Sequence, residues 1–318
     1  MSQTDPTRRL RIATRESPLA LWQARHIGEL LGKQITTPEI VPMVSRGDVD
    51  MSPIDGTRTV GIFTKRIQDA LLADEGDIAV HSMKDLPTEE HPDLVLAGTV
   101  QRETVADCLV TVNGVELNQL PKGANVGTGS RRRAAQLKRL RPDLNVTPIR
   151  GNVQTRLEKL NSGQYDAIVL AAAGIERLKL HTLPRVEMTL EVMLPAPGQG
   201  ALAVETRRDD SEAIHAVNTI SDERTMACIT AERTMLAQLH GGCLAPIAGL
   251  STIGDSGDQL LLHGRVLSVD GSTCLESKQH LKIDFPSESW FSTAVSLGKT
   301  VSDDLIGQGA LELIQSNR

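Results

Sequence analysis

The sequence predicts an α/β fold in which parallel sheets carry helices on both faces, followed by a smaller α+β region. Apolar runs of strand length alternate with segments of helical spacing through residues 9–175. The 318 residues are enough for about two or three domains. Hydrophobic residues make up 40% of the chain and charged residues 23%, a mixture that can bury a core and differs from that of disordered chains.

The first predicted unit is a strand followed by a helix. Arg9–Ala13 reads as a short strand, and Ser17 with Pro18 supplies a helix N-cap and a first-turn proline before the helical pattern LALWQARHIGELL. The same alternation then repeats along the chain. Strands are predicted from residues 39, 77, 94, 125, 145 and 167 (the last reading AIVLAAAG), and helices over 62–72, 130–140 and 153–160.

Two segments rich in Pro and Gly, 111–125 and 191–200, interrupt this alternation and are candidate hinges or crossovers. Beyond Asp209 the pattern changes to a long helix, SDERTMACITAERTMLAQL, a Gly-Gly-Cys turn and two strands, LLLHGRVLSV and TCLESKQHLKI. One terminal helix is predicted from about Ser287 to Gln315. The last third of the chain therefore reads as a separate α+β region.

Composition excludes several classes of protein. The net charge of −6 argues against general binding to phosphate polymers, and 2% aromatic residues leave little for base stacking. The N-terminus has no apolar core typical of a signal peptide, and the apolar run Ile168–Ile175 is too short to span a bilayer. We therefore expect a cytoplasmic protein without a membrane or nucleic-acid partner. The four cysteines lack C-x-x-C spacing, so we expect no metal site.

A strand that ends in Gly-Thr-Gly-Ser and continues into a helix, VGTGSRRRAAQLKRLR from Val126, predicts an anion site. The turn offers backbone N–H groups, hydroxyls and the positive end of a helix dipole. Nine basic residues against two acidic ones lie within 125–160. Arg132, Arg133, Arg150 and Arg156 are at or near strand-to-helix junctions, where α/β sheets bind ligands. Lys138, Arg139 and Arg141 are expected to face solvent.

A second cluster, His81-Ser82-Met83-Lys84-Asp85, follows a buried strand and precedes a proline. Side chains in this position project into the cleft of a parallel sheet. Asp85 is the leading acid–base candidate. The alternative is a structural role, as a helix N-cap or in an ion pair with Lys84.

The third motif, His-Gly-Gly-Cys-Leu-Ala-Pro from residue 240, places Cys243 after two glycines, which allow the backbone to bend and expose the sulfur. Cys243 is either a reactive thiol or a packed small side chain, whereas Cys108, Cys228 and Cys274 are expected to be packed. From these residues alone, the chain has an arginine-lined site for a polycarboxylate or phosphate, a cleft aspartate and one exposed thiol.

Eight blocks in order resemble the porphobilinogen deaminase (hydroxymethylbilane synthase) family over residues 9 to about 250. They are RIATRESPLALWQA, RGD at Arg46, HSMKDLP, GTGSRRRAAQL, IRGNVQTRL, LAAAGIERL, LPAPGQGALAVE and GGCLAP. The resemblance implies two lobes like those of type II periplasmic binding proteins, with mostly parallel sheets, and a small α+β C-terminal domain. We predict domain 1 at 1–100 plus 200–218, domain 2 at 101–199 and domain 3 at 219–318.

The resemblance also implies an activity. The family joins four porphobilinogen molecules head to tail into 1-hydroxymethylbilane, releases four ammonia, and carries one dipyrromethane cofactor bound to a cysteine through a thioether. Each pyrrole brings an acetate and a propionate, so a growing chain needs many guanidinium partners. A monomeric enzyme of tetrapyrrole (heme) biosynthesis without a metal is expected.

The family's functional residues carry over by motif. Asp85 matches the catalytic aspartate and Cys243 the attachment cysteine. The remaining cofactor-binding candidates are Ser82, Lys84, Thr128, Ser130, Arg132, Arg133 and Arg150, and the substrate-binding candidates are Arg15, Ser17, Arg156, Arg177 and Gln199.

This sequence departs from the family pattern in two places. Gly129 replaces a serine, which removes one hydroxyl donor, and Gly56–Gly61 lacks the lysine usual before Ile62 and Phe63. No binding lysine is assigned there, and Arg58 is the candidate substitute.

Two alternative functions use the same arginines. A non-catalytic two-lobed anion receptor would need no special thiol, and a nucleic-acid-binding protein would show steep salt dependence.

Overall fold

A computed structural model describes residues 8–35, 37–44, 64–240, 245–287 and 289–316. The chain forms two compact units. Unit 1 comprises the N-terminal residues up to Glu103 together with Gly200–Met226, and unit 2 comprises Thr104–Gln199 together with the residues from Ala227 onward. The described residues contain no helix long and apolar enough to cross a membrane.

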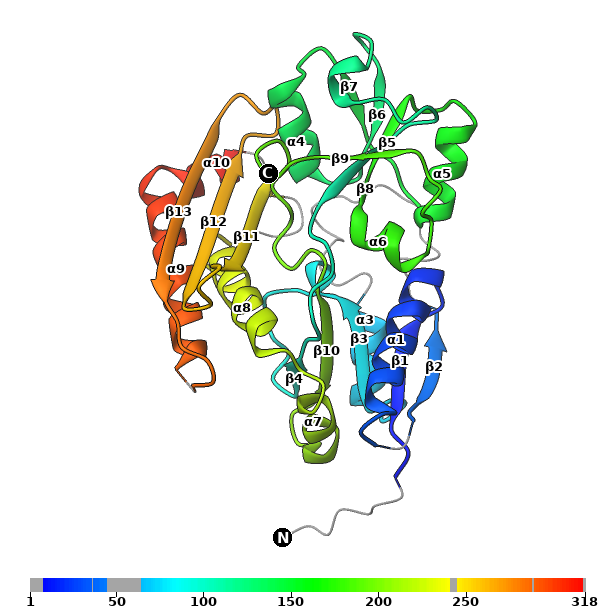
Figure 1. The fold of residues 1–318 in the computed structure, drawn as a ribbon, viewed down its shortest axis with the longest axis vertical. Helices are drawn as coiled ribbons and strands as arrows, with labels where there is room; N and C mark the ends of the chain where they lie inside the picture. Colours follow the sequence, from blue (N-terminus) through cyan, green and yellow to red (C-terminus); the bar gives the residue numbers. More distant parts are fainter. Residues whose placement is uncertain (1–7, 36, 45–63, 241–244, 288, 317–318) are drawn as a thin grey trace. The chain divides into compact units, whose positions relative to one another are not determined.

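Unit 1 contains a five-stranded sheet in the order β2-β1-β3-β10-β4 (Figure 1). β1 pairs in parallel with β2 and β3, whereas β10 pairs antiparallel with β3 and β4. The strands are β1 (Arg11–Arg15), β2 (Glu39–Met43), β3 (Ile78–Ser82), β4 (Leu94–Gly98) and β10 (Leu202–Arg207), and the helices are α1 (Pro18–Leu31), α3 (Lys65–Leu72) and α7 (Ser211–Asn218).

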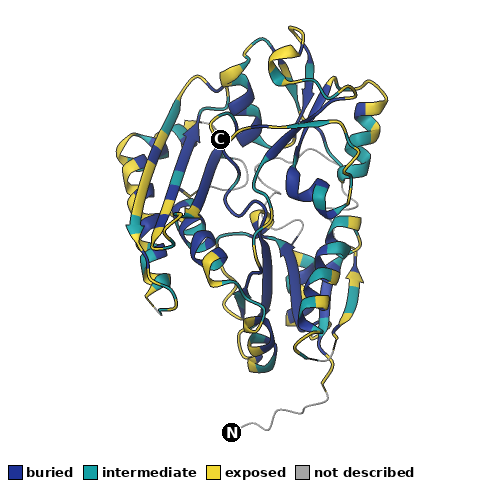
Figure 2. Ribbon diagram, in the orientation of Figure 1, coloured by how far each residue is buried: buried dark blue, intermediate teal, exposed yellow. Residues whose placement is uncertain are grey.

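Helices cover both faces of this sheet. Ile27 of α1 and Val217 of α7 pack with Val80 of β3 in one buried cluster. Ile67 of α3 packs with Ala79, the neighbouring residue of β3, in another. Because successive side chains of a strand point to opposite faces, α1 and α7 lie on one face and α3 on the other. β3 and β10 are accordingly dark blue, that is buried, in Figure 2.

Unit 2 contains a second five-stranded sheet, in the order β7-β6-β8-β5-β9, with β6 parallel to β7 and β8 and with β5 antiparallel to β8 and β9. Leu137 of α4 packs on one face of this sheet, and Leu160 of α5 with Ile175 of α6 on the other. The elements are β5 (Asp107–Val110), β6 (Asn125–Gly127), β7 (Asn145–Thr147), β8 (Ala167–Ala171), β9 (Arg185–Glu187), α4 (Arg131–Leu140), α5 (Val153–Asn161) and α6 (Ala172–Arg177).

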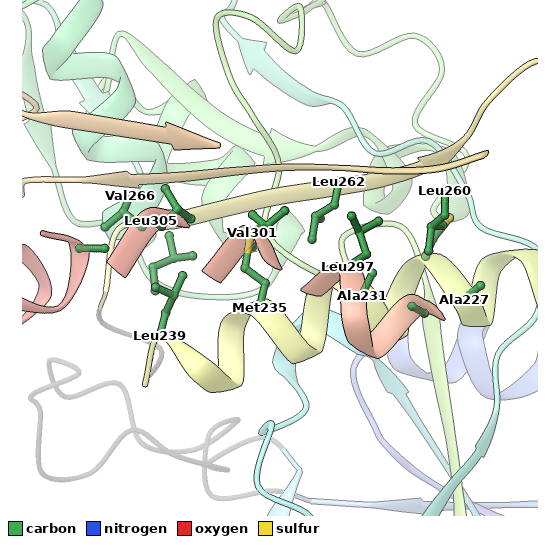
Figure 3. Packing of buried hydrophobic residues seen from close by; sticks show 14 of the residues in the cluster. Ala227, Ala231, Met235, Leu239, Leu260, Leu262, Val266, Leu297, Val301 and Leu305 are labelled. Atoms are coloured by element: carbon green, nitrogen blue, oxygen red, sulfur yellow. The ribbon is translucent and has the colours of Figure 1, made fainter. Parts of the chain in front are cut away.

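The C-terminal part of unit 2 has its own three-stranded antiparallel sheet, β11-β12-β13, and its own core (Figure 3). Met235 of α8 packs against this sheet where Gly249 and Gly264 lack side chains; a Cβ at either glycine would lie 2.5 Å from the Met235 side chain. The elements are α8 (Glu223–Gln238), β11 (Ile247–Ile253), β12 (Gln259–Leu267), β13 (Cys274–Lys282), α9 (Trp290–Gly307) and α10 (Ala310–Ser316).

The predicted fold class is confirmed: two α/β sheets with parallel pairing and helices on both faces precede an α+β region. Two predicted elements are wrong in detail. The strand predicted as AIVLAAAG ends at Ala171 and continues as helix α6, because a short buried apolar run fits either conformation. The single terminal helix is two helices, separated where Gly309 adopts a positive φ of 98°.

Five elements escaped prediction: β5, β9, β10, β11 and α7. Four of them are strands that pair antiparallel with their neighbours. Antiparallel strands can be joined without a crossover helix, so the sequence around them shows no alternation of strand and helix patterns. In the helix predicted over 62–72, residues 62 and 63 lie outside the described residues and the helix begins at Lys65. The three-domain boundaries remain a prediction.

Candidate active site

A cavity of about 80 Å³ lies in unit 1 at the carboxyl ends of β1 and β3. Its lining includes four of the predicted site residues, Arg15, Ser17, Ser82 and Asp85. Gln23, Thr64 and His81 complete its polar lining. Parallel strands deliver their final residues to one edge of a sheet, which is why residues from separate motifs meet here.

Local structure explains how Asp85 reaches the cavity. β3 ends at Ser82 and the chain turns through a short 3₁₀ segment, Met83–Asp85. The buried Met83 anchors this turn, and its N–H donates to the carbonyl oxygen of Ala201 at 3.0 Å. Lys84 and Asp85 remain exposed, so the turn presents the carboxylate to solvent and to any ligand in the cavity.

The first turns of α1 form another part of the cavity lining. Ser17 is the N-cap, its Oγ accepting the N–H of Ala20 at 3.4 Å, as the sequence predicts. Gln23 is buried, and its Nε2 donates to Oγ of Ser82 at 2.9 Å. This hydrogen bond fastens the helix to the end of β3.

The arginine-rich junction belongs to unit 2. Ser130 is the N-cap of α4, its Oγ accepting the N–H of Arg133 at 3.4 Å, and Oγ1 of Thr128 accepts the N–H of Ser130 at 3.2 Å. Arg132 and Arg133 point into the protein and are 4% and 5% exposed. Both donate to Asp107, a fully buried carboxylate on β5, at 2.8 Å and 2.6 Å.

This cluster carries an excess of positive charge. Two guanidiniums share the single carboxylate of Asp107, which also accepts from Nε2 of Gln199 at 2.9 Å. Burial by itself would raise the pKa of Asp107, but Arg132 and Arg133 outweigh it and hold that pKa well below its usual range. In the described part of the chain, Nε of Arg132 is buried without a hydrogen-bond acceptor.

Three other predicted residues, Arg150, Arg156 and Arg177, also belong to unit 2. Arg156 donates from Nε to the carbonyl oxygen of Gly151 at 2.9 Å, which holds the turn before α5. Arg150 is half-buried in that turn, and Arg177 is buried at the end of α6. Cys243 and Arg58 lie outside the described residues.

The remaining cysteines are packed as expected. Cys108 and Cys228 are buried and Cys274 is half-buried. Burial raises the pKa of the Cys108 thiol to about 12, so this thiol is inert at neutral pH. The described residues hold no group of three or more His, Cys, Asp or Glu side chains suited to a metal ion.

Sequence reasoning missed three polar residues in or beside the unit 1 cavity, Gln23, Thr64 and Glu205, and it placed His81 in the second cluster without giving it a role. Glu205 lies on β10, directly behind His81. A glutamate inside the apolar run ALAVETR was the available signal, because a charged residue in the middle of a buried strand needs a partner.

Fold and site together define the class: an α/β protein with a polar cavity in one unit, lined by Arg15 and Asp85, and a buried cationic junction in the other. Family models give the particular assignment. The model "Porphobilinogen deaminase, dipyromethane cofactor binding domain" matches residues 10–215, and "Porphobilinogen deaminase, C-terminal domain" matches 226–307. The chain belongs to the porphobilinogen deaminase family.

Curated relatives agree with this assignment. The chain is 41% identical to a porphobilinogen deaminase of Corynebacterium efficiens over 306 residues, covering 96% of this chain and 99% of that protein. It is 42% identical over 311 residues to one of Xanthomonas campestris, covering 96% and 98%.

Solved structures with similar folds include a putative methionine-binding lipoprotein of Bacillus subtilis. Its TM-score is 0.43 and its identity 14%, over 67% of this chain and 89% of that chain. The methionine-binding protein MetQ has a TM-score of 0.44 and 13% identity, over 69% and 92%.

Proposed function

We propose that this chain joins four porphobilinogen molecules head to tail into 1-hydroxymethylbilane, with release of four ammonia, on a covalently attached dipyrromethane primer. The observation that carries the proposal is the cavity that Asp85 and Arg15 line together, in a chain whose residues 10–215 match a family domain named for that cofactor. In this cavity, the carboxylate of Asp85 can bind a positively charged group of the substrate, and the guanidinium of Arg15 can bind a carboxylate.

Porphobilinogen suits this lining. Its acetate and propionate side chains need hydrogen-bond donors, which the guanidinium of Arg15 and the hydroxyl groups of Ser17 and Ser82 provide. Its pyrrole N–H and its aminomethyl group are donors and need acceptors such as the carboxylate of Asp85. Each charged hydrogen bond contributes about 1.5 to 3 kcal/mol, so a few of them suffice to hold a small substrate.

We assign Asp85 to the stabilisation of positive charge. Loss of ammonia from the aminomethyl group leaves a cation on the substrate ring. A carboxylate 4 Å from that charge stabilises it by about 4 kcal/mol at an effective dielectric of about 20. After the new carbon–carbon bond forms, Asp85 accepts the proton that the α-carbon of the attacking pyrrole loses, and this loss restores the aromaticity of that ring. Its exposed position allows this proton to pass on to water.

The buried cluster of unit 2 fits a polycarboxylate cofactor. Among the described residues, Arg132 and Arg133 share the single carboxylate of Asp107, and Nε of Arg132 has no hydrogen-bond acceptor. We propose that the dipyrromethane binds here through its carboxylates, with the remaining contacts and a Cys243 thioether as the family resemblance implies. When bound, it supplies the carbon atom to which pyrrole units are added. The proposed contacts are Ser82, Lys84, Thr128, Ser130, Arg132, Arg133 and Arg150.

The remaining assignments rest on the family resemblance. We propose Arg156, Arg177 and Gln199, with Arg15 and Ser17, as substrate-binding residues. We also propose that the protein is a cytoplasmic monomer without nucleic-acid or membrane partners.

The test is turnover of porphobilinogen by the purified protein, followed as ammonia release and bilane formation. We expect Asp85→Asn to lower kcat at least about 100-fold, with an unchanged melting temperature because Asp85 is exposed. Asp93→Asn is the matched control: this carboxylate is in the same unit and 74% exposed. Absence of both products with the native protein would exclude the proposed function.

A further inference from the structure

Behind the unit 1 cavity lies a buried histidine–glutamate pair that the assignments above leave unused. His81 and Glu205 are each 5% exposed, and His81 lines the cavity. Nε2 of His81 is 3.0 Å from Oε2 of Glu205. In the register of β3 with β10, His81 lies opposite Ala203 and Glu205 opposite Ala79, so both side chains extend from the face that α3 covers.

The negative charge of Glu205 is compensated differently from those of two other buried carboxylates, Asp77 and Asp107. Asp77 is bound by Arg8, Arg11 and Arg207, and Asp107 by two arginines. Glu205 instead accepts from a neutral amide, Nε2 of Gln68, at 3.1 Å to each oxygen. Among the residues that the structure describes, no lysine or arginine forms an ion pair with Glu205. A buried charge of this kind favours a cation nearby.

His81 lies between Glu205 and the cavity, so the carboxylate polarises the imidazole that lines the cavity. A carboxylate next to Nε2 favours the neutral tautomer that has its proton on Nε2 and its lone pair on Nδ1. The Nε2–Oε2 contact is short but not in line for a full hydrogen bond, and such contacts commonly tighten when a ligand binds. The other charged groups of the cavity are Arg15 and Asp85; Ser17, Gln23, Thr64 and Ser82 are neutral.

We propose that His81, oriented by Glu205, receives the aminomethyl ammonium of porphobilinogen, the group that leaves as ammonia. This inference rests on the proposed function. The ammonium donates to Nδ1 of His81, and Glu205 strengthens that contact because it makes the imidazole a better acceptor. When the carbon–nitrogen bond breaks, its electron pair stays on nitrogen and ammonia leaves with its three protons. Through this contact, His81 favours substrates whose leaving group is cationic.

The experiment compares two ligands that differ only at this group. Porphobilinogen is assayed for kcat/KM. The same ring with a methyl in place of the aminomethyl group keeps both carboxylates and the N–H, cannot react, and is assayed as a competitive inhibitor. Replacing a residue that positions the ammonium should lower kcat/KM for porphobilinogen and leave the inhibition constant of the methyl analogue unchanged. Damage to the fold should weaken the binding of both ligands.

Three variants complete the design. His81→Gln keeps an amide nitrogen near the Nε2 position and so retains the Glu205 contact, but it removes Nδ1. Glu205→Gln keeps the shape and removes the charge. His91→Gln is the control, since His91 is an exposed histidine of the same unit. We expect kcat/KM to fall about 10- to 100-fold in His81→Gln and Glu205→Gln. The inhibition constant of the methyl analogue should stay within twofold, and His91→Gln should change neither.

Other outcomes overturn the inference. Equal losses for both ligands, or failure of both variants to fold, would show that the pair only supports the sheet. Unchanged kcat/KM would show that the pair takes no part. If the native protein releases no ammonia at all, the proposed function fails instead, and the native control separates this case from the others.

Discussion

Replacing Asp107 with asparagine tests whether the arginine pair of unit 2 depends on one internal carboxylate. Asp107 has no exposed surface, and Arg132 and Arg133, at 5% and 7% side-chain exposure, are almost equally buried. Asparagine fits the same space but has no charge and only one acceptor oxygen. Breaking a buried ion pair by removing one partner costs about 3 to 5 kcal/mol, because the charge left behind is uncompensated. This corresponds to a fall in melting temperature of roughly 6 to 20 °C.

The pH dependence gives a second measurement of the same effect. Arg132 and Arg133 overcome the cost of burial and hold the pKa of Asp107 below its unfolded value. The ion pairs therefore stabilise the fold fully above about pH 4, and this contribution is lost as the pH falls toward the folded pKa. Urea unfolding of the native protein and Asp107→Asn should show a large difference in free energy of unfolding at pH 7, which narrows below about pH 4.

The matched control is Asp143→Asn. Asp143 also pairs with an arginine, Arg141, at 2.7 Å, but the two side chains are 30% and 20% exposed. Water can replace the lost partner there, so we expect little change in stability. A loss below about 1 kcal/mol in Asp107→Asn would refute the reasoning, because it would mean that the two guanidiniums reach water or another acceptor.

Two further predictions rest on particular contacts, and a third rests on the family resemblance. Asp77→Asn should destabilise unit 1 less than Asp107→Asn destabilises unit 2, because the arginines around Asp77 are 18 to 36% exposed and can turn to solvent; denaturant melts of both variants compare them. Gly127→Ala should cost about 1 to 3 kcal/mol of unfolding free energy, because a Cβ there would lie 2.7 Å from Cδ1 of Tyr165; wild-type stability would contradict this. Cys243→Ser should have its bare sequence mass by intact mass spectrometry, whereas the native chain should carry a two-pyrrole adduct that reacts with Ehrlich's reagent. A native chain without the adduct would favour the receptor alternative.

Local sequence predicted much of what surrounds the site. The N-cap Ser17 was identified because a capping hydroxyl bonds the backbone two or three residues ahead, an interaction that lies within the motif itself. The position of Asp85 after a buried strand was predicted for the same reason: a strand and the turn that ends it are adjacent in the chain. The fold class followed from alternating strand and helix patterns, which are also local.

Long-range partners were not predictable in the same way. Asp107 lies 26 residues from Arg133, and Gln68 lies 137 residues from Glu205. Local pattern places Arg132 and Arg133 at a junction where exposed ligand binders are expected, yet the structure turns both guanidiniums inward onto Asp107. Four of the missed elements are antiparallel strands, whose partners come from distant parts of the chain.

The sequence by itself therefore determined the strands, caps and turns that bring Asp85 and the arginines to sheet edges, because these depend on neighbours within a few residues. Only the tertiary structure decided which charges meet. Asp107 lies beside two arginines, whereas Glu205 lies beside a histidine and an amide. A buried charge has lost its contact with water, so it must be stabilised by the side chains around it. These neighbours are set by the fold and not by their order in the chain.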